Sequence, residues 1–95
     1  MRIKTHPGEV LREEFMEPMG ISANALSIAL RVPATRVGDI VNERRAVSAD
    51  TALRLARYFG TTAQFWLNLQ SNYDLSKAEM EIGEKIADEV RPRAA

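Results

Sequence analysis

Six arginines lie between residues 22 and 60, and their side chains could bind nucleic acid. They are opposed there by only Asp39, Glu43 and Asp50, so this segment carries a net charge of +3, although the whole chain of 95 residues has a net charge of zero. A guanidinium group can donate two hydrogen bonds to O6 and N7 of guanine, and it also pairs with phosphate. Because local potential determines where a ligand binds, the middle of the chain is the candidate binding surface.

Two short helical segments are predicted around the first of these arginines. Ser22 is a suitable N-cap for the first segment, whose apolar residues share one helix face: Leu26, Ala29 and Leu30. The residue before a proline is pushed out of the helical region, so Arg31–Pro33 should end this helix. A second helix should begin at Pro33 or Ala34, with an inner face of Val37, Ile40 and Val41. Two short helices joined by a tight turn form the helix-turn-helix arrangement, whose second helix fits the major groove of DNA.

The outer face of this second helix carries side chains that match base edges. Its predicted outward residues are Ala34, Thr35, Arg36, Gly38 and Asp39. Arg36 can bind guanine, Thr35 offers a hydroxyl and a methyl group, and Asp39 could accept a hydrogen bond from N4 of cytosine. Ala34 and Gly38 are small enough to let the backbone approach DNA. Two residues just beyond the helix suit phosphate contacts that set the register, Arg44 and Arg45.

The same pattern also fits a protein that does not bind DNA. Helix–turn–helix spacing occurs in many helical bundles, and Arg44 and Arg45 could simply be solvated. Gly38 costs a helix roughly 1 kcal/mol relative to alanine, which could reflect close helix packing as easily as close approach to DNA. Asp39 would be repelled by phosphate unless it reads cytosine or holds Arg36 in place. The pattern alone therefore leaves DNA binding and a protein-only interaction module open.

The remaining segments are also predicted to be helical, so the fold class is all-α. Pro7 suits the first position of a helix that Glu17–Gly20 should stop. Ser48 should cap a helix that ends at Gly60. Capping boxes predict a fifth helix and a separate last helix, at Thr61 with Gln64 and at Ser76 with Glu79. No stretch alternates with period two, so no sheet is expected.

The composition offers no set of residues for catalysis or metal binding. The chain has no cysteine, and its single histidine, His6, stands at a helix entrance, which fits a capping or surface residue. Glu13 and Glu14 are adjacent and do not face each other on a helix. We therefore expect no enzyme activity, cofactor, metal site or small-molecule substrate. No apolar run approaches the roughly 18 residues of a membrane span, and the N-terminus lacks a secretory signal, so a cytoplasmic protein without membrane contact is expected.

Four segments, taken in order, resemble the HigA-type antitoxins of the phage-repressor-like (XRE) helix-turn-helix family. They are HPGEVLREEF, NALSIALRVPATRVGDIVNERR, TALRLARYFGT and FWLNLQSNYDL. The resemblance implies a five-helix domain over residues 1–75, which dimerises on double-stranded operator DNA and represses its own operon. It also implies neutralisation of a co-expressed toxin, usually a RelE-like mRNA endoribonuclease. A solitary regulator without a toxin is the alternative.

The resemblance also assigns roles to individual residues. The groove-reading helix becomes Ala34–Asn42, with Thr35, Arg36 and Asp39 as the main base readers, and backbone amides would approach phosphate at Ser22 and Ala23. Alanine, glycine and glycine are common in the family where this chain has Ser27, Arg31 and Glu43. Arg31 should be strained if its turn needs a positive φ, and its charge could reach phosphate. Because Glu43 replaces a glycine that would provide a left-handed helix cap, Asn42 could provide this cap instead. Glu43 also brings negative charge toward the DNA.

The segment FWLNLQ, residues 65–70, is apolar on more than one helix face. One face should complete the core, and the other should leave an exposed patch of the kind that marks association. We therefore predict a two-fold homodimer through Phe65, Trp66, Leu67 and Leu69, with the reading helices about 34 Å apart. Trp66 could instead belong to the core. Residues 76–95 form a C-terminal extension whose apolar stripe should pack on the domain or on a partner: Ile82, Ile86 and Val90.

Overall fold

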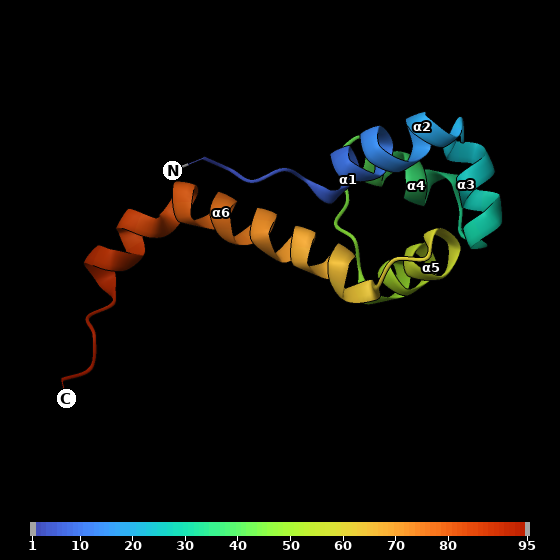
Figure 1. Cartoon of the computed structure of the whole chain (residues 1–95). Coiled ribbons are helices and arrows are strands. Elements are labelled where there is room, and N and C mark those ends of the chain that lie inside the picture. Colours follow the sequence, from blue (N-terminus) through green and yellow to red (C-terminus); the bar gives the residue numbers. More distant parts are fainter. Residues whose placement is uncertain (1, 95) are drawn as a thin grey trace.

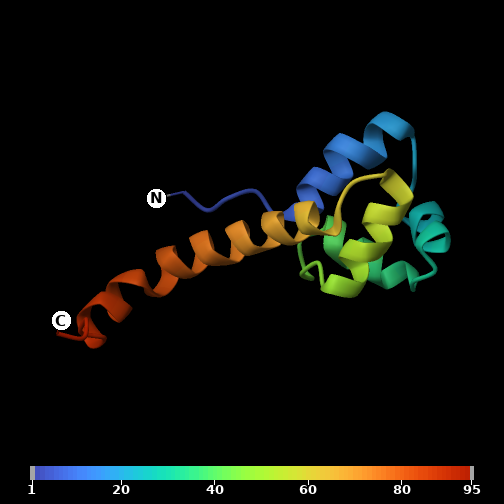
Figure 2. The same ribbon diagram turned by 60° about the horizontal axis from the view of Figure 1, so that its bottom comes forward.

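A computed structural model describes residues 2–94, and within this range the chain is helical and contains no strand, as predicted (Figure 1). The elements are α1 (Pro7–Val10), the π-helix η1 (Leu11–Met16), α2 (Glu17–Met19), α3 (Ala23–Leu30), α4 (Ala34–Val41), α5 (Ala49–Phe59) and α6 (Ala63–Glu89). The helices before α6 and the start of α6 form a compact head, and the rest of α6 extends away from it (Figures 1 and 2). We call residues 77–89 the projecting end of α6. The resulting molecule is elongated, with extents of 53 × 23 × 22 Å.

The elements α1, η1 and α2 form one continuous helical segment. His6 is its N-cap, and the Nδ1 atom of His6 accepts a hydrogen bond of 2.8 Å from the backbone N–H of Gly8. The predicted capping role of His6 is therefore confirmed, but its side chain is buried rather than exposed. The segment ends before Gly20, whose φ of 64° is left-handed and accessible to glycine at little cost, so the predicted stop is also confirmed.

One hydrophobic core joins the helices of the head. Its largest fully buried side chains come from five different elements: Leu11, Leu26, Ile40, Leu55 and Trp66. The indole N–H of Trp66 donates a hydrogen bond of 2.8 Å to the Thr61 hydroxyl, and its ring lies 5.1 Å from that of Phe15. Trp66 has no exposed surface. Its predicted place in a dimer interface is therefore wrong, and the core alternative is correct.

Helix α6 is a single helix of 27 residues, about 40 Å long. Its N-cap is Thr62, whose hydroxyl accepts from the N–H of Phe65, so the helix begins one residue later than predicted. The capping box predicted at Thr61 with Gln64 is wrong, because Gln64 bonds to Asn68 instead and Phe65 cannot return a hydrogen bond to Thr62. Ser76 does not begin a helix. Its hydroxyl lies inside α6, where it donates to the Tyr73 carbonyl and accepts from the N–H of Lys4 at 2.8 Å. A serine can bond to its own helix in this way without ending it, so the C-terminal residues are helical but continue α6.

The projecting end of α6 exposes an apolar stripe. Ile82, Ile86 and Val90 are 46%, 48% and 63% exposed, so of the two predicted alternatives the one in which they pack on their own domain is wrong. These residues follow Ser76, which accepts the hydrogen bond from Lys4 in the N-terminal arm, residues 2–5. No helix of the described residues, α6 included, is long and apolar enough to cross a membrane.

Candidate nucleic-acid interface

Helices α3 and α4 are joined by a tight left-handed turn. The hydroxyl of Ser22 caps α3 by accepting from the N–H of Ala25 at 3.1 Å. Arg31 ends α3 with φ 61° and ψ 45°, and the N–H of Val32 returns to the carbonyl of Ser27 at 3.0 Å. This is a Schellman motif, which usually has glycine at the left-handed position. The predicted strain at Arg31 is confirmed, because a non-glycine residue occupies that conformation.

Helix α4 has the inner and outer faces that the sequence predicts. Its inner residues Val37, Ile40 and Val41 are buried in the core. Ala34 and Thr35 are exposed at its first turn, and Arg36 and Asp39 are partly exposed beside them. Gly38 has no atom near the position that a Cβ would occupy, so close helix packing does not explain this glycine.

The first helical segment positions α4 through its backbone. A Cβ atom on Gly8 would overlap the carbonyl oxygen of Ile40 and lie 2.8 Å from the carbonyl carbon. The guanidinium of Arg12 donates a hydrogen bond to the carbonyl of Val41, at the end of α4. Gly8 and Arg12 therefore fix the depth and the end of the helix whose outer face is available to a ligand.

The chain leaves α4 through a second left-handed residue. This residue is Glu43, with φ 62°, whereas Asn42 has φ −94°, so the prediction that Asn42 provides the cap is wrong. Asn42 instead uses its side-chain amide, which donates to the carbonyl of Gly38 at 2.8 Å. The amide keeps Asn42 attached to the last turn, and the reversal of the chain consequently falls on the next residue.

Ion pairs engage two of the predicted base readers. Asp39 accepts from Arg44 at 3.0 Å, so it holds Arg44 and not Arg36. Arg36 donates to Asp50, in the first turn of α5, at 3.2 Å. Asp50 also accepts from Arg54 at 2.7 Å. The hydrogen bond from Arg54 is the main reason why the pKa of Asp50 is lowered, and Arg36 contributes to the same shift.

The predicted phosphate-binding residues lie around the outer face of α4. Ser22 is exposed and Ala23 is partly exposed at the start of α3, where the first N–H groups of a helix have no acceptor within it. Arg31 is exposed in the turn between α3 and α4, and Arg44 and Arg45 are exposed just beyond the end of α4. Neither Arg31 nor Arg45 has an ion pair within residues 2–94. The turn residues therefore leave two arginines available to an anion.

The residues proposed for association do not form one surface. Phe65 is 37% exposed, and its ring centroid lies 6.3 Å from that of Phe15. Leu69 packs against the core. Leu67 is partly buried and instead shares a shallow groove along α6 with Leu75. Of the four, Leu67 is the one that continues toward the exposed stripe of the projecting end.

Sequence reasoning did not identify four residues that shape this interface: Gly8, Arg12, Asp50 and Arg54. Each acts on a residue far along the chain, with separations of 14 to 29 residues for the hydrogen bonds of Arg36, Arg54 and Arg12. Asp50 carried one usable signal, because an acidic residue in the first turn of a helix is favoured by the helix dipole. That signal indicates a stable helix and says nothing about a bound arginine.

The buried inner face of α4, its exposed first turn and the bracing helix α3 together define a helix-turn-helix unit. The family model described as Helix-turn-helix matches residues 13–66 of this chain. Virulence-associated protein I of Dichelobacter nodosus is 59% identical over 76 residues, which cover 80% of this chain and 70% of that protein.

Solved structures extend the similarity to the whole chain. The antitoxin HigA of Pseudomonas aeruginosa, solved with the higBA promoter, is 52% identical with a TM-score of 0.93, and the match covers 98% of this chain and all of that one. The antitoxin GraA in complex with its operator is 50% identical with a TM-score of 0.94, covering 100% and 95% of the two chains. The chain belongs to the helix-turn-helix family, and within it to the HigA-type antitoxins.

Proposed function

We propose that this protein is a sequence-specific transcriptional repressor that acts in the cytoplasm and binds the operator of its own gene through α4. The observation that carries the proposal is the outer face of α4, where Ala34 and Thr35 are fully available while the opposite face is locked into the core. Two relatives of about 50% identity are antitoxins solved with promoter or operator DNA, which supports the same role here.

The contacts divide into base reading and backbone positioning. Arg36 and Thr35 would be the main readers of base edges, and Ala34 and Asp39 would contact bases from the same face of α4. Arg31, Arg45 and the amide groups at the start of α3, around Ser22 and Ala23, would contact phosphates. Arg44 neutralises Asp39 and so reduces the repulsion between Asp39 and the DNA backbone. The exposed carboxylate of Glu43, next to Arg44 in the sequence, would repel the DNA backbone.

Fluorescence anisotropy with the duplex upstream of the gene tests this proposal. Wild type should bind this duplex more tightly than a scrambled one, and its affinity should fall steeply as salt rises because phosphate contacts release counterions. Arg36→Ala should lose on the order of 1–3 kcal/mol and relax the preference at one base position. Arg45→Ala should weaken binding to all duplexes alike and reduce the salt slope. Equal affinity of wild type for the two duplexes would overturn the proposal.

The dimer is proposed to form through α6. Its apolar stripe begins at Leu67, continues through Leu75, and follows one side of the helix along Ile82 and Ile86. Apart from Leu67, which is partly buried, these side chains are exposed, and an exposed apolar stripe of this kind suits a two-fold contact between two copies of the helix. Sedimentation should give a dimer for wild type and a folded monomer for Ile82→Asp/Ile86→Asp, because neither side chain contributes to the core. A dimeric double variant would contradict this interface.

The antitoxin role includes a proposed protein partner. HigA-type relatives carry the name antitoxin, and we infer that this chain binds and neutralises a RelE-like endoribonuclease encoded beside it. Expression of the neighbouring gene alone should arrest growth. Co-expression of this chain should relieve the arrest, and the chain should co-purify with the product of that gene. A neighbouring product that is harmless and unbound would leave the second candidate, a solitary operator-binding regulator.

A further inference from the structure

A carboxylate at the start of α5 controls where the side chain of Arg36 lies. Oδ1 of Asp50 accepts one hydrogen bond from Nη1 of Arg36, at 3.2 Å, and another from Nε of Arg54, at 2.7 Å. Arg36 therefore leans from the first turn of α4 toward α5 instead of extending straight into solvent. Its side chain keeps 29% of its surface exposed.

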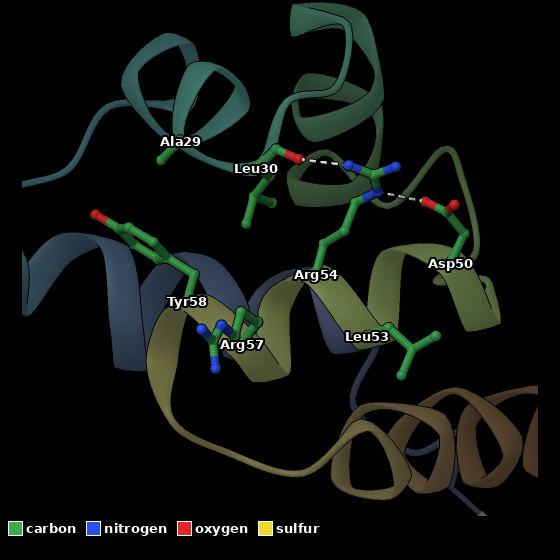
Figure 3. Close-up of a pocket in the computed structure, with 7 residues that line it drawn as sticks. All are labelled: Ala29, Leu30, Asp50, Leu53, Arg54, Arg57 and Tyr58. Atoms are coloured by element: carbon green, nitrogen blue, oxygen red, sulfur yellow. Dashed lines mark hydrogen bonds and ion pairs between the residues drawn. The ribbon is translucent and has the colours of Figure 1, made fainter.

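Asp50 is itself anchored to the bracing helix. Arg54 lines a groove between α3 and α5, and its Nη1 donates to the carbonyl of Leu30 at 2.9 Å while its Nε donates to Asp50 (Figure 3). The carbonyl of Leu30 belongs to the last turn of α3, so it is one of the acceptors that the helix leaves unused. A continuous set of hydrogen bonds thus runs from the end of α3 to the first turn of α4.

The geometry points to Asp50 as a positioning residue that sets the base specificity of Arg36, an inference that rests on the operator-binding function proposed above. A guanidinium has five N–H donors in one plane, and Asp50 uses only one of those on Arg36. The others remain for the O6 and N7 of a guanine. Because the side chain is already oriented, Arg36 loses less conformational freedom when it binds a base.

The same carboxylate has an opposite effect on binding that does not depend on sequence. The side chain of Asp50 is 57% exposed and pairs with Arg36, so its charge repels the phosphates of any duplex that approaches α4. Removing this charge should therefore raise the affinity for all DNA and, at the same time, reduce discrimination at one base pair. A residue that only stabilised the fold would not produce these two changes together.

Asp50→Asn tests this inference, because asparagine keeps the shape of the side chain and removes the charge. Affinities would be measured for the duplex upstream of the gene, for variants of it with one guanine replaced at a time, and for a scrambled duplex. We expect discrimination at a single base pair to fall about three- to tenfold, as part of the selectivity of an arginine–guanine pair. Affinity for the scrambled duplex should rise. Asp88→Asn, on the projecting end of α6, is the control with the same change of net charge.

Two further variants keep the inference falsifiable. In an Arg36→Ala background, Asp50→Asn should cause no further loss at that base pair, since the two residues act as a unit. Arg54→Lys keeps the charge but replaces the two nitrogens that bond to Asp50 and Leu30 with one, so it should weaken the same discrimination. The melting temperature of this variant checks that the fold is intact. Unchanged or greater discrimination in Asp50→Asn, in a wild type that prefers its operator, would overturn this inference alone. A wild type with no operator preference would overturn the proposed function and this inference with it.

Discussion

The head and the projecting end of α6 are stabilised in different ways. In the head, α1, η1, α3, α4, α5 and the start of α6 share one core, and Leu55 and Trp66 are fully buried there. In the projecting end, Ile82 and Ile86 remain about half exposed, and the residues contact little outside their own helix. An isolated helix of about 13 residues is marginally stable in water. The difference indicates that the head folds by itself, while the end of α6 needs a partner to gain stability.

Replacing one apolar residue from each region should separate them most clearly. Trp66→Ala removes the largest buried side chain and its hydrogen bond to Thr61, and should reduce the free energy of unfolding by about 3–5 kcal/mol. Ile86→Ala should change it by about 0.5 kcal/mol or less when the protein is monomeric. Chemical denaturation of both variants at low concentration measures this, and similar losses would show that the end of α6 belongs to the core.

Two glycines provide a matched pair of substitutions. Gly8→Ala forces a Cβ into the Ile40 carbonyl, so α1 and α4 must separate, at a cost of about 1–3 kcal/mol or more. Gly83→Ala lies inside α6 with its nearest neighbour, Cβ of Glu79, at 3.9 Å, and should instead strengthen the helix by up to about 1 kcal/mol. Thermal unfolding followed by circular dichroism gives both values. A Gly8→Ala protein with unchanged stability would mean that α1 does not set the position of α4.

The smallest expected effect lies at the border between the regions, where His6 meets Tyr73 of α6 edge to face with ring centroids 4.7 Å apart. Burial lowers the pKa of His6 below its ordinary value of 6.5, so the unfolded chain binds a proton that the folded chain resists. Stability should therefore decrease as the pH falls from 6.5 to the lower pKa of the folded state. Asp50 does not interfere, because the lowered pKa of this carboxyl places its loss of stability below about pH 4.

His6→Asn serves as the control for this pH dependence. Asparagine can still accept the hydrogen bond from Gly8 at the N-cap but has no proton to bind. Urea midpoints at pH 7.5 and 5.5 should differ for wild type and differ less for the variant. Equal pH dependence in the two proteins would assign the effect to another group.

The local features of the head could be predicted from the sequence. Ser22, Ser48, Gly20 and Gly60 mark helix ends by rules that involve only nearby residues, and the period of Val37, Ile40 and Val41 identified the inner face of α4. The left-handed turn at Arg31 followed from the family pattern. These signals located the candidate site because it lies on one short segment.

The remaining features depend on contacts between distant parts of the chain. Ser76 has the sequence pattern of a helix start, but the arm residue Lys4 occupies its hydroxyl within an unbroken helix. From the sequence, Trp66 could lie in the core or in a dimer interface, and only its contacts with Phe15 and Thr61 show that it lies in the core. The pairing of Arg36 with Asp50 joins two helices, and no local rule distinguishes it from a pairing with Asp39.

The central claim is that DNA contact belongs to the head and that the projecting end of α6 takes no part in it. Backbone amide chemical shifts, recorded while the duplex upstream of the gene is added, test this claim directly. The account predicts the largest changes at the start of α3, along residues 34–39 and at Arg44 and Arg45, with little change over residues 77–89. Large changes confined to residues 77–89, with residues 34–45 unaffected, would contradict it.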